Sequence, residues 1–408
     1  MTAPIHPRHH ALLDRIRQNV DRDEPLYQAD EARIPVTNYT DEQRFALERA
    51  RLFRRVPVVV AHASDVAVPG ACITRTIAGI SVVIVRGKDG VLRGFLNACR
   101  HRATELVSEP ACHKNALVCP YHNWAYDLTG ALIDVPHQRA FPSLERDELG
   151  LVAVPVEEHA GLIWVTARPG DDGAGNARPD ATPDAAPGDA APGEAAATHS
   201  VARFLGPLAE ELEALELADH IIYRRFTNTR RANWKLVIEL FIESYHVRFL
   251  HRKSVYPYFL DAASVVERER PHFRALSARR ALSAPPDQQR EMGLRDLATP
   301  SYLIFPNTIF VVHQDFVSHL VIWPTAVDHF QWCHTMLIPE EPTTDSARRH
   351  WETNVTLIEE RVFQGEDLAT AEAMQRGLDT GANRELVVGQ LESPIAWFHD
   401  DIAAAIGV

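Results

Sequence analysis

The chain has 408 residues, a formal net charge of -13 at pH 7 and a pI near 5.8. This length suits two or three domains, and the excess of acidic side chains argues against a nucleic-acid partner. The sequence has no apolar run of about 18 residues, which argues against a membrane span. The first ten residues lack the apolar core of a secretion signal, so we expect a cytoplasmic protein.

The pattern of residue types in the sequence changes near residue 55. Residues 1–54 are predicted to form a helical segment, in which Thr40-Asp41-Glu42-Gln43 resembles an N-cap and a first helical turn. Short β-branched runs follow, such as residues 80–86 and 92–96, with a Gly-Lys-Asp-Gly turn between these two. The runs predict a small all-β domain over residues 55–167.

Two Cys-His pairs lie within this domain, and each pair occupies its own short loop. The first loop holds Cys99 and His101, and the second holds Cys119 and His122. A structural zinc site usually takes both cysteines from one loop, whereas here each loop offers one thiolate and one imidazole. This alternation favours a Rieske-type [2Fe-2S] cluster, in which two Cys bind one iron and two His bind the other. A zinc site and unconnected core residues are the alternatives.

Three other cysteines remain, at positions 72, 112 and 333. We interpret them as buried small hydrophobic residues that stay reduced, because a cytoplasmic protein rarely contains disulfides.

The residues around the two loops carry a family resemblance. Residues 99–102 read Cys-Arg-His-Arg, and residues 119–126 read Cys-Pro-Tyr-His-Asn-Trp-Ala-Tyr. Both segments resemble the large (alpha) subunit of Rieske non-haem iron oxygenases, which includes the aromatic-ring-hydroxylating enzymes and their relatives. Ala103 and Asn123 stand where that family commonly has Gly, so we expect a slightly different loop geometry.

Residues 168–199 consist almost entirely of small and polar residues with many prolines. They contain no aromatic or large aliphatic side chain, and we predict a disordered insertion. Residues 200–408 are predicted to form the second domain, with a helix over 203–217 and several strands between 301 and 337.

A second metal site is expected in residues 236–251, which read as one helix. Glu239, Glu243 and His246 would share a face of this helix, where two buried carboxylates need a nearby cation. His246 and His251 can bind one ion only if the helix loosens or ends between them.

The acidic residues Glu366 and Asp367 are expected to open a helix near the C-terminus, where the helix dipole alone would explain them. The family resemblance implies more, because Asp367 matches the third ligand of the family's mononuclear iron. His246, His251 and Asp367 would then form a two-His, one-carboxylate site for Fe(II).

The resemblance implies an α+β chain with a Rieske domain and a helix-grip catalytic domain, in which a curved antiparallel sheet holds a long helix. It implies a terminal oxygenase that uses O2 to hydroxylate, dihydroxylate or oxidatively demethylate a small organic molecule. Electrons would come from an NAD(P)H-dependent reductase or a ferredoxin, because the chain shows no flavin or nicotinamide motif. A Rieske electron carrier is the alternative, but it would leave the second iron site without a purpose.

In the family, large subunits form a ring of three, which implies a homotrimer here. Glu243 matches the carboxylate that joins the two metal centres across subunits, from His246 to His122 of the partner subunit. This position usually holds Asp, and Glu resembles the branch that acts on quaternary ammonium compounds such as carnitine and glycine betaine. We slightly favour an aromatic substrate, because an apolar line suits a ring, namely Ile238, Phe241, Ile242, Phe249 and Phe310. Trp323 and Trp332 could instead cage a cation, although buried Trp in a sheet is the commoner case.

Overall fold

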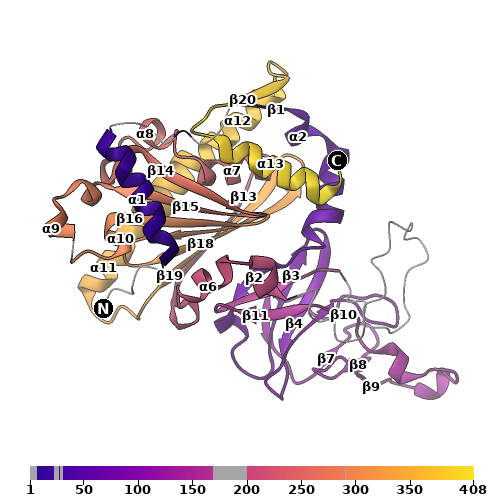
Figure 1. Ribbon diagram of the computed structural model, residues 1–408. Coiled ribbons are helices and arrows are strands. Elements are labelled where there is room, and N and C mark those ends of the chain that lie inside the picture. Colours follow the sequence, from indigo (N-terminus) through magenta and orange to yellow (C-terminus); the bar gives the residue numbers. More distant parts are fainter. Residues whose placement is uncertain (1–6, 23–26, 28–30, 169–199, 290) are drawn as a thin grey trace. The chain divides into compact units, whose positions relative to one another are not determined.

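The computed structural model describes residues 7–22, 27, 31–168, 200–289 and 291–408. The predicted insertion at 168–199 therefore lies, apart from Arg168, outside the described residues. Contacts divide the chain into two compact units (Figure 1). One unit is Phe53–Ala218, and the other joins the residues up to Leu52 with Asp219–Val408. Residues 200–218 belong by their contacts to the Phe53–Ala218 unit, although we expected the second domain to begin at residue 200.

The Phe53–Ala218 unit is built from three antiparallel sheets. A five-stranded sheet has the order β10-β5-β4-β3-β6, and two three-stranded sheets have the orders β11-β12-β2 and β7-β8-β9. The predicted strands at 80–86 and 92–96 are present as β4 and β5. The strands are β2 (Val58–His62), β3 (Ala71–Ile77), β4 (Ile80–Arg86), β5 (Leu92–Leu96), β6 (Ala111–His113), β7 (Leu117–Val118), β8 (Ala125–Tyr126), β9 (Leu132–Asp134), β10 (Ala153–Val154), β11 (Val156–His159) and β12 (Leu162–Val165).

The unit ends in two short helices, α5 (Val201–Leu205) and α6 (Leu208–Glu213). The single helix predicted for 203–217 is wrong, because Gly206 and Pro207 interrupt it. Gly206 adopts a positive φ of 54°, and proline cannot continue the preceding helix.

Cys72 and Cys112 form a disulfide, which corrects the expectation that both stay reduced. The two residues are paired across β3 and β6, which are adjacent antiparallel strands. Forty residues separate them in the sequence, so only the strand register brings their side chains together. Cys333 keeps its thiol, as expected, although its side chain is half-buried rather than buried.

The other unit is organised around a seven-stranded antiparallel sheet with the order β13-β19-β18-β17-β16-β15-β14. Helix α1 (Pro7–Arg22) contacts β14 and β15 and is drawn in indigo across these strands in Figure 1. Helix α7 (Trp234–Ile242) packs on β18 and against α12 and α13. The strands are β13 (Ile221–Arg230), β14 (Phe259–Glu269), β15 (His272–Arg279), β16 (Ala298–Ile304), β17 (Thr308–Val312), β18 (Val317–Ala326) and β19 (His329–Ile338).

The N-terminal segment is only partly helical, so the prediction of one helical segment over 1–54 is wrong. After α1, strand β1 (Ala32–Pro35) pairs with β20 (Glu385–Val388). Helices α2 (Thr37–Thr40) and α3 (Glu42–Leu47) follow, and a π-helical turn, η1, covers Glu48–Phe53. Asp41 is the N-cap of α3, and its carboxylate accepts a hydrogen bond from the backbone of Arg44 at 2.8 Å.

Three consecutive helical segments form the C-terminal part of this unit. Helix α11 (Asp345–Asn354) continues through the π-helical segment η8 (Val355–Leu368) into α12 (Ala369–Asp379). Asp367 therefore lies inside a long helical run, and the expectation that it opens a helix is wrong. Wide π turns shift the side chains that follow them and often occur at functional sites. Further short helices are α8 (Val247–Leu250), α9 (Pro286–Gln289) and α10 (Leu294–Leu297), and the chain closes with α13 (Ser393–Ile406).

Among the helices in the part of the chain that the structure describes, none has the length and apolar character needed to cross a bilayer.

Candidate metal centres

The two Cys-His loops of the Phe53–Ala218 unit adopt the same hydrogen-bonded turn. In the first loop the backbone N–H of Cys99 donates to the carbonyl of Thr104 at 2.8 Å, and Ala103 donates back to Cys99 at 2.9 Å. In the second loop Cys119 donates to the carbonyl of Trp124 at 2.8 Å. Asn123 donates back to Cys119 at 3.0 Å.

The two departures from the family's glycines fall on the left-handed residue of each turn. Ala103 has a φ of 59° and Asn123 has a φ of 58°. Glycine adopts this conformation freely, asparagine tolerates it, and alanine is strained in it. The two loops therefore match each other in geometry. The residues that replace glycine keep this geometry at the cost of backbone strain, which is greater at Ala103 than at Asn123.

The cysteines of the two loops are buried in the core of the unit, with Cys99 3% exposed and Cys119 2% exposed. The hydroxyl of Tyr126 lies 3.3 Å from Sγ of Cys99 and accepts a hydrogen bond from the backbone N–H of Arg100 at 3.0 Å. Its own hydrogen is therefore available to Sγ. Burial raises the pKa of the Cys99 thiol, and the bond from Tyr126 opposes that shift.

The two histidines of these loops lie side by side and are half-buried. Their ring centroids are 4.7 Å apart, and the ring of His101 stacks on Trp124 at 4.7 Å. The Nδ1 atoms of His101 and His122 are both buried and accept or donate no hydrogen bond within the described residues. Buried polar atoms usually have a partner, so two orphaned imidazole nitrogens beside two buried thiols fit an iron–sulfur cluster.

The predicted long helix over 236–251 is broken. Helix α7 ends at Ile242, and Glu243 is extended with φ -130° and ψ 168°. The four-residue helix α8 then separates His246, which precedes it, from His251, which follows it. The helix is broken before His246, and α8 ends at Leu250, so the helix also ends between the two histidines, as expected. This end lets their rings face one another, with centroids 5.0 Å apart.

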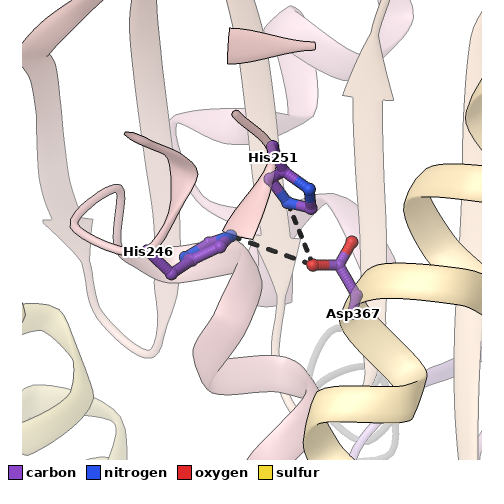
Figure 2. Close-up of side chains that lie close together, drawn as sticks. All are labelled: His246, His251 and Asp367. Carbon is purple, nitrogen blue, oxygen red and sulfur yellow. Dashed lines mark ion pairs between the residues drawn. The ribbon is translucent and has the colours of Figure 1, made fainter. Parts of the chain in front are cut away.

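His246, His251 and Asp367 converge on one point (Figure 2). Oδ1 of Asp367 lies 3.1 Å from Nε2 of His251 and 3.8 Å from Nε2 of His246. The three potential ligand atoms all lie within 4.8 Å of one another, and this is the one such group of three or more among the described residues. Two imidazole nitrogens and a carboxylate in this arrangement fit a divalent iron site.

Each of the two histidines has a carboxylate on its other nitrogen. Glu243 accepts a hydrogen bond from Nδ1 of His246, and its second oxygen accepts one from the His246 backbone at 3.2 Å. Glu366 lies 2.6 Å from Nδ1 of His251 and also accepts a bond from Ser254 at 2.6 Å. Ionised carboxylates can only accept, so both Nδ1 atoms carry hydrogen and both Nε2 lone pairs point at the shared site.

Charge at the site also favours a cation. Burial alone would lower the pKa of His251, but hydrogen bonds and charge from Asp367 and Glu366 outweigh burial and raise the pKa. An imidazole between two carboxylates stabilises positive charge, which a bound metal ion would supply.

Sequence reasoning missed the role of Glu366 and misplaced that of Glu239. We attributed Glu366 to the helix dipole, but it orients His251 from inside a helical run. Glu239 does not share a face with the iron-site residues; it accepts from the Tyr39 hydroxyl at 2.9 Å and lies 2.8 Å from Nε2 of His399. The partners of this buried acid are therefore the hydroxyl of Tyr39 and a histidine of α13.

A cavity of about 440 Å³ adjoins the His246, His251 and Asp367 site. Of the apolar line predicted for an aromatic substrate, only Phe241 lines this cavity. Ile238, Ile242 and Phe310 lie in the core, and Phe249 is exposed. Neither Trp323 nor Trp332 lines the cavity, so they form no cage there, and Trp332 is a buried residue of the sheet, the commoner case.

Two known families match the two regions of the chain that contain these candidate centres. Residues 56–145 match the family described as the Rieske [2Fe-2S] domain. Residues 217–407 match the family described as the ring hydroxylating alpha subunit, catalytic domain.

Full-length relatives act on a quaternary ammonium compound. The chain is 31% identical over 387 residues to the carnitine monooxygenase oxygenase subunit of Escherichia coli K12, covering 91% of this chain and 92% of that protein. Aromatic dioxygenases match over a shorter region. The alpha subunit of benzene 1,2-dioxygenase from Pseudomonas putida is 36% identical over 153 residues, which is 37% of this chain and 34% of that protein.

Solved structures share the fold across both units. The quaternary ammonium Rieske monooxygenase CntA in complex with L-carnitine aligns with a TM-score of 0.72 and 25% identity, covering 92% of this chain and 96% of that chain. Naphthalene 1,2-dioxygenase with bound indole aligns with a TM-score of 0.68 and 19% identity, covering 94% of each chain.

The fold, the two candidate metal centres and the full-length relatives agree. A Rieske oxygenase requires a reductase partner, and its cofactors are a [2Fe-2S] cluster and a mononuclear iron. The chain belongs to the large (alpha) subunits of Rieske non-haem iron oxygenases and is the terminal oxygenase component of such a system.

Proposed function

We propose that Cys99, His101, Cys119 and His122 hold the [2Fe-2S] cluster, and that His246, His251 and Asp367 hold the mononuclear iron. The orphaned Nδ1 atoms of His101 and His122 support the first assignment. The convergence of three ligand atoms within 4.8 Å supports the second. When bound, the cluster supplies single electrons and the iron(II) activates dioxygen.

The protein's own side chains prepare this chemistry by fixing orientation. Glu243 and Glu366 hold the two imidazoles through Nδ1, so that neither ring can turn its Nε2 away from the site. Asp367 brings negative charge between the two Nε2 atoms. The adjoining cavity offers a place for the substrate next to these groups.

We propose a quaternary ammonium substrate rather than the aromatic one that the sequence slightly favoured. This proposal rests mainly on the wall of the 440 Å³ cavity, which combines aromatic rings with carboxylates. Tyr256, Tyr258 and Phe316 line the cavity with aromatic rings, which suit a trimethylammonium group. Asp261 and Asp315 line it with carboxylates, which are paired with Arg248 and His350. The similarity to carnitine monooxygenase over 91% of the chain supports the same substrate class.

An aromatic substrate is the second candidate. It is favoured by aromatic rings that meet in the cavity wall. The centroid of Phe241 lies 5.7 Å from that of Phe363, and both rings line the cavity. An aromatic hydrocarbon would cover the arginine, aspartate and serine side chains of the other walls without bonding to them, and the loss of their hydration is costly.

The assembly and the location are part of the same proposal. A ring of three subunits would let Glu243 join His246 to the cluster ligand His122 of the partner subunit. Inter-subunit electron transfer in a quaternary ammonium Rieske monooxygenase supports this arrangement. The electron donor would be an NAD(P)H-dependent reductase or a ferredoxin. We propose that the protein is cytoplasmic, because its electron donor would rely on reduced nicotinamide. Cell fractionation would test this location.

The substrate class can be tested with iron-loaded protein, a reductase and 18O2. We expect turnover of trimethylammonium carboxylates with one labelled oxygen in the product, and no turnover of benzene or toluene. His246→Ala should abolish turnover while the visible spectrum of the cluster stays. Turnover of the hydrocarbons but not of the ammonium compounds would establish the second candidate, and turnover by His246→Ala would refute the iron assignment.

A further inference from the structure

Two arginines line the cavity beside the iron site, and they differ in their partners. Arg248 forms an ion pair with Asp261, which lines the same cavity. Arg279, the last residue of β15, forms no ion pair within the described residues. A guanidinium is charged at every physiological pH, so this cavity contains a cation that the protein does not neutralise by direct contact.

The contacts of Arg279 hold its side chain in place without using all its donors. One terminal nitrogen donates to Oγ1 of Thr299 at 3.2 Å, and the other donates to Oε1 of Gln314 at 2.8 Å. Its carbon Cζ lies 5.5 Å from the ring centroid of Phe259. Both acceptors are neutral, and a guanidinium has five N–H groups. Three donors therefore remain on a side chain that is already oriented.

The negative groups near Arg279 are engaged elsewhere. Asp315 lies 2.5 Å from Nε2 of His350, and Asp296 accepts from the backbone of Gly293 at 3.0 Å. Their charges reach Arg279 only at longer range, and burial lowers the pKa of the guanidinium despite them.

The neighbouring histidine cannot substitute for Arg279. Burial lowers the pKa of His313 to about 3, so His313 is neutral in this wall of the cavity. A negatively charged ligand group would meet Arg279, and a carboxylate matches the geometry of a guanidinium.

We propose that Arg279 binds a carboxylate of the substrate and so determines which end of the molecule reaches the iron site. The inference rests on the proposed function, because it assigns a specificity residue to the same cavity. A substrate anchored by its carboxylate at Arg279 presents its opposite end to His246, His251 and Asp367. The oxidised carbon is then remote from the carboxylate.

The test measures binding to anaerobic, iron-loaded protein by calorimetry with two matched pairs of probes. One pair is 4-(trimethylammonio)butanoate and its methyl ester, and the other is benzoate and methyl benzoate. We expect the wild type to prefer a carboxylate over its ester, and Arg279→Gln to lose at least about 30-fold in affinity for the carboxylate alone. Arg279→Lys should recover part of the preference, because it keeps the charge without the planar fork. Arg280→Gln is the control, since Arg280 is exposed and does not line the cavity.

The outcomes separate this inference from the substrate class. A wild type that binds carboxylates and esters equally would overturn the role of Arg279, whichever pair binds. So would an Arg279→Gln variant that keeps the preference, or an equal loss in Arg280→Gln. A preference that Arg279→Gln removes in the benzoate pair, with no binding of either ammonium probe, would support the role of Arg279 and refute the quaternary ammonium substrate.

Discussion

Oε2 of Glu366 lies 2.6 Å from Nδ1 of His251, on the side of the ring opposite to Asp367. Carboxylates that orient a metal-binding histidine typically change metal affinity by about 10-fold to 100-fold when they are removed. We therefore expect Glu366→Ala to weaken Fe(II) binding within that range and to leave the cluster spectrum unchanged. Iron titration of the apo site measures this.

Glu360→Ala is the control for Glu366→Ala, because Glu360 is exposed and belongs to the same π-helical segment. Equal iron affinity in both variants would contradict the orienting role of Glu366.

The strained residue of the first cluster loop predicts a stabilising substitution. Ala103 has a φ of 59°, so Ala103→Gly should raise the free energy of unfolding by about 1 kcal/mol. Asn123→Gly should stabilise less, because asparagine tolerates this conformation. Denaturant unfolding measures both.

The same chemical change in a strand gives the opposite expectation. Ala111→Gly in β6 should lower the free energy of unfolding by roughly 0.5 to 1 kcal/mol, because glycine loses more backbone freedom there. If Ala103→Gly destabilises the protein as Ala111→Gly does, the positive φ is not a source of strain.

Glu243 and Glu366 make the same kind of contact with a histidine of the iron site, yet only Glu243 is proposed to reach the cluster of another subunit. Glu243→Gln should therefore keep both metal centres and the ring of three but slow the oxidation of the pre-reduced cluster by substrate and air. A single-turnover experiment followed at the cluster absorbance measures this. Glu366→Gln, compared per bound iron, should oxidise its cluster at the wild-type rate. Equal rates of cluster oxidation in Glu243→Gln and wild type would refute the bridging role of Glu243. A fully active monomer would refute the ring of three.

The cysteines of the Phe53–Ala218 unit are expected to separate into two functional classes. Cys119→Ser should bleach the visible spectrum, because Cys119 is a proposed cluster ligand. Cys112→Ser should keep the spectrum but lower the free energy of unfolding by roughly 4 kcal/mol without reductant, because the Cys72–Cys112 disulfide closes a loop over a separation of 40 residues. Loss of colour in Cys112→Ser, or its retention in Cys119→Ser, would contradict this division.

Local chemistry in the sequence was sufficient for several features. The cluster loops could be predicted because Cys99 and His101 are two residues apart and Cys119 and His122 are three apart, so each pair lies on one turn. Strands β4 and β5 and the Asp41 cap likewise depend on a few neighbouring residues. The choice of His246, His251 and Asp367 came from a family resemblance rather than from spacing.

The tertiary structure decided the features that depend on distant partners. Glu366 is 115 residues from His251, and Glu239 is 160 residues from His399, so no local pattern indicates either pair. The pairing of Cys72 with Cys112 depends on the register of β3 and β6. The break after Ile242 overrides a helical pattern, because Glu243 leaves the helix to accept bonds from the backbone and ring of His246. The sequence could not show that Arg279 forms no ion pair within the described residues, because the fold decides which acidic side chains lie beside it in the cavity wall.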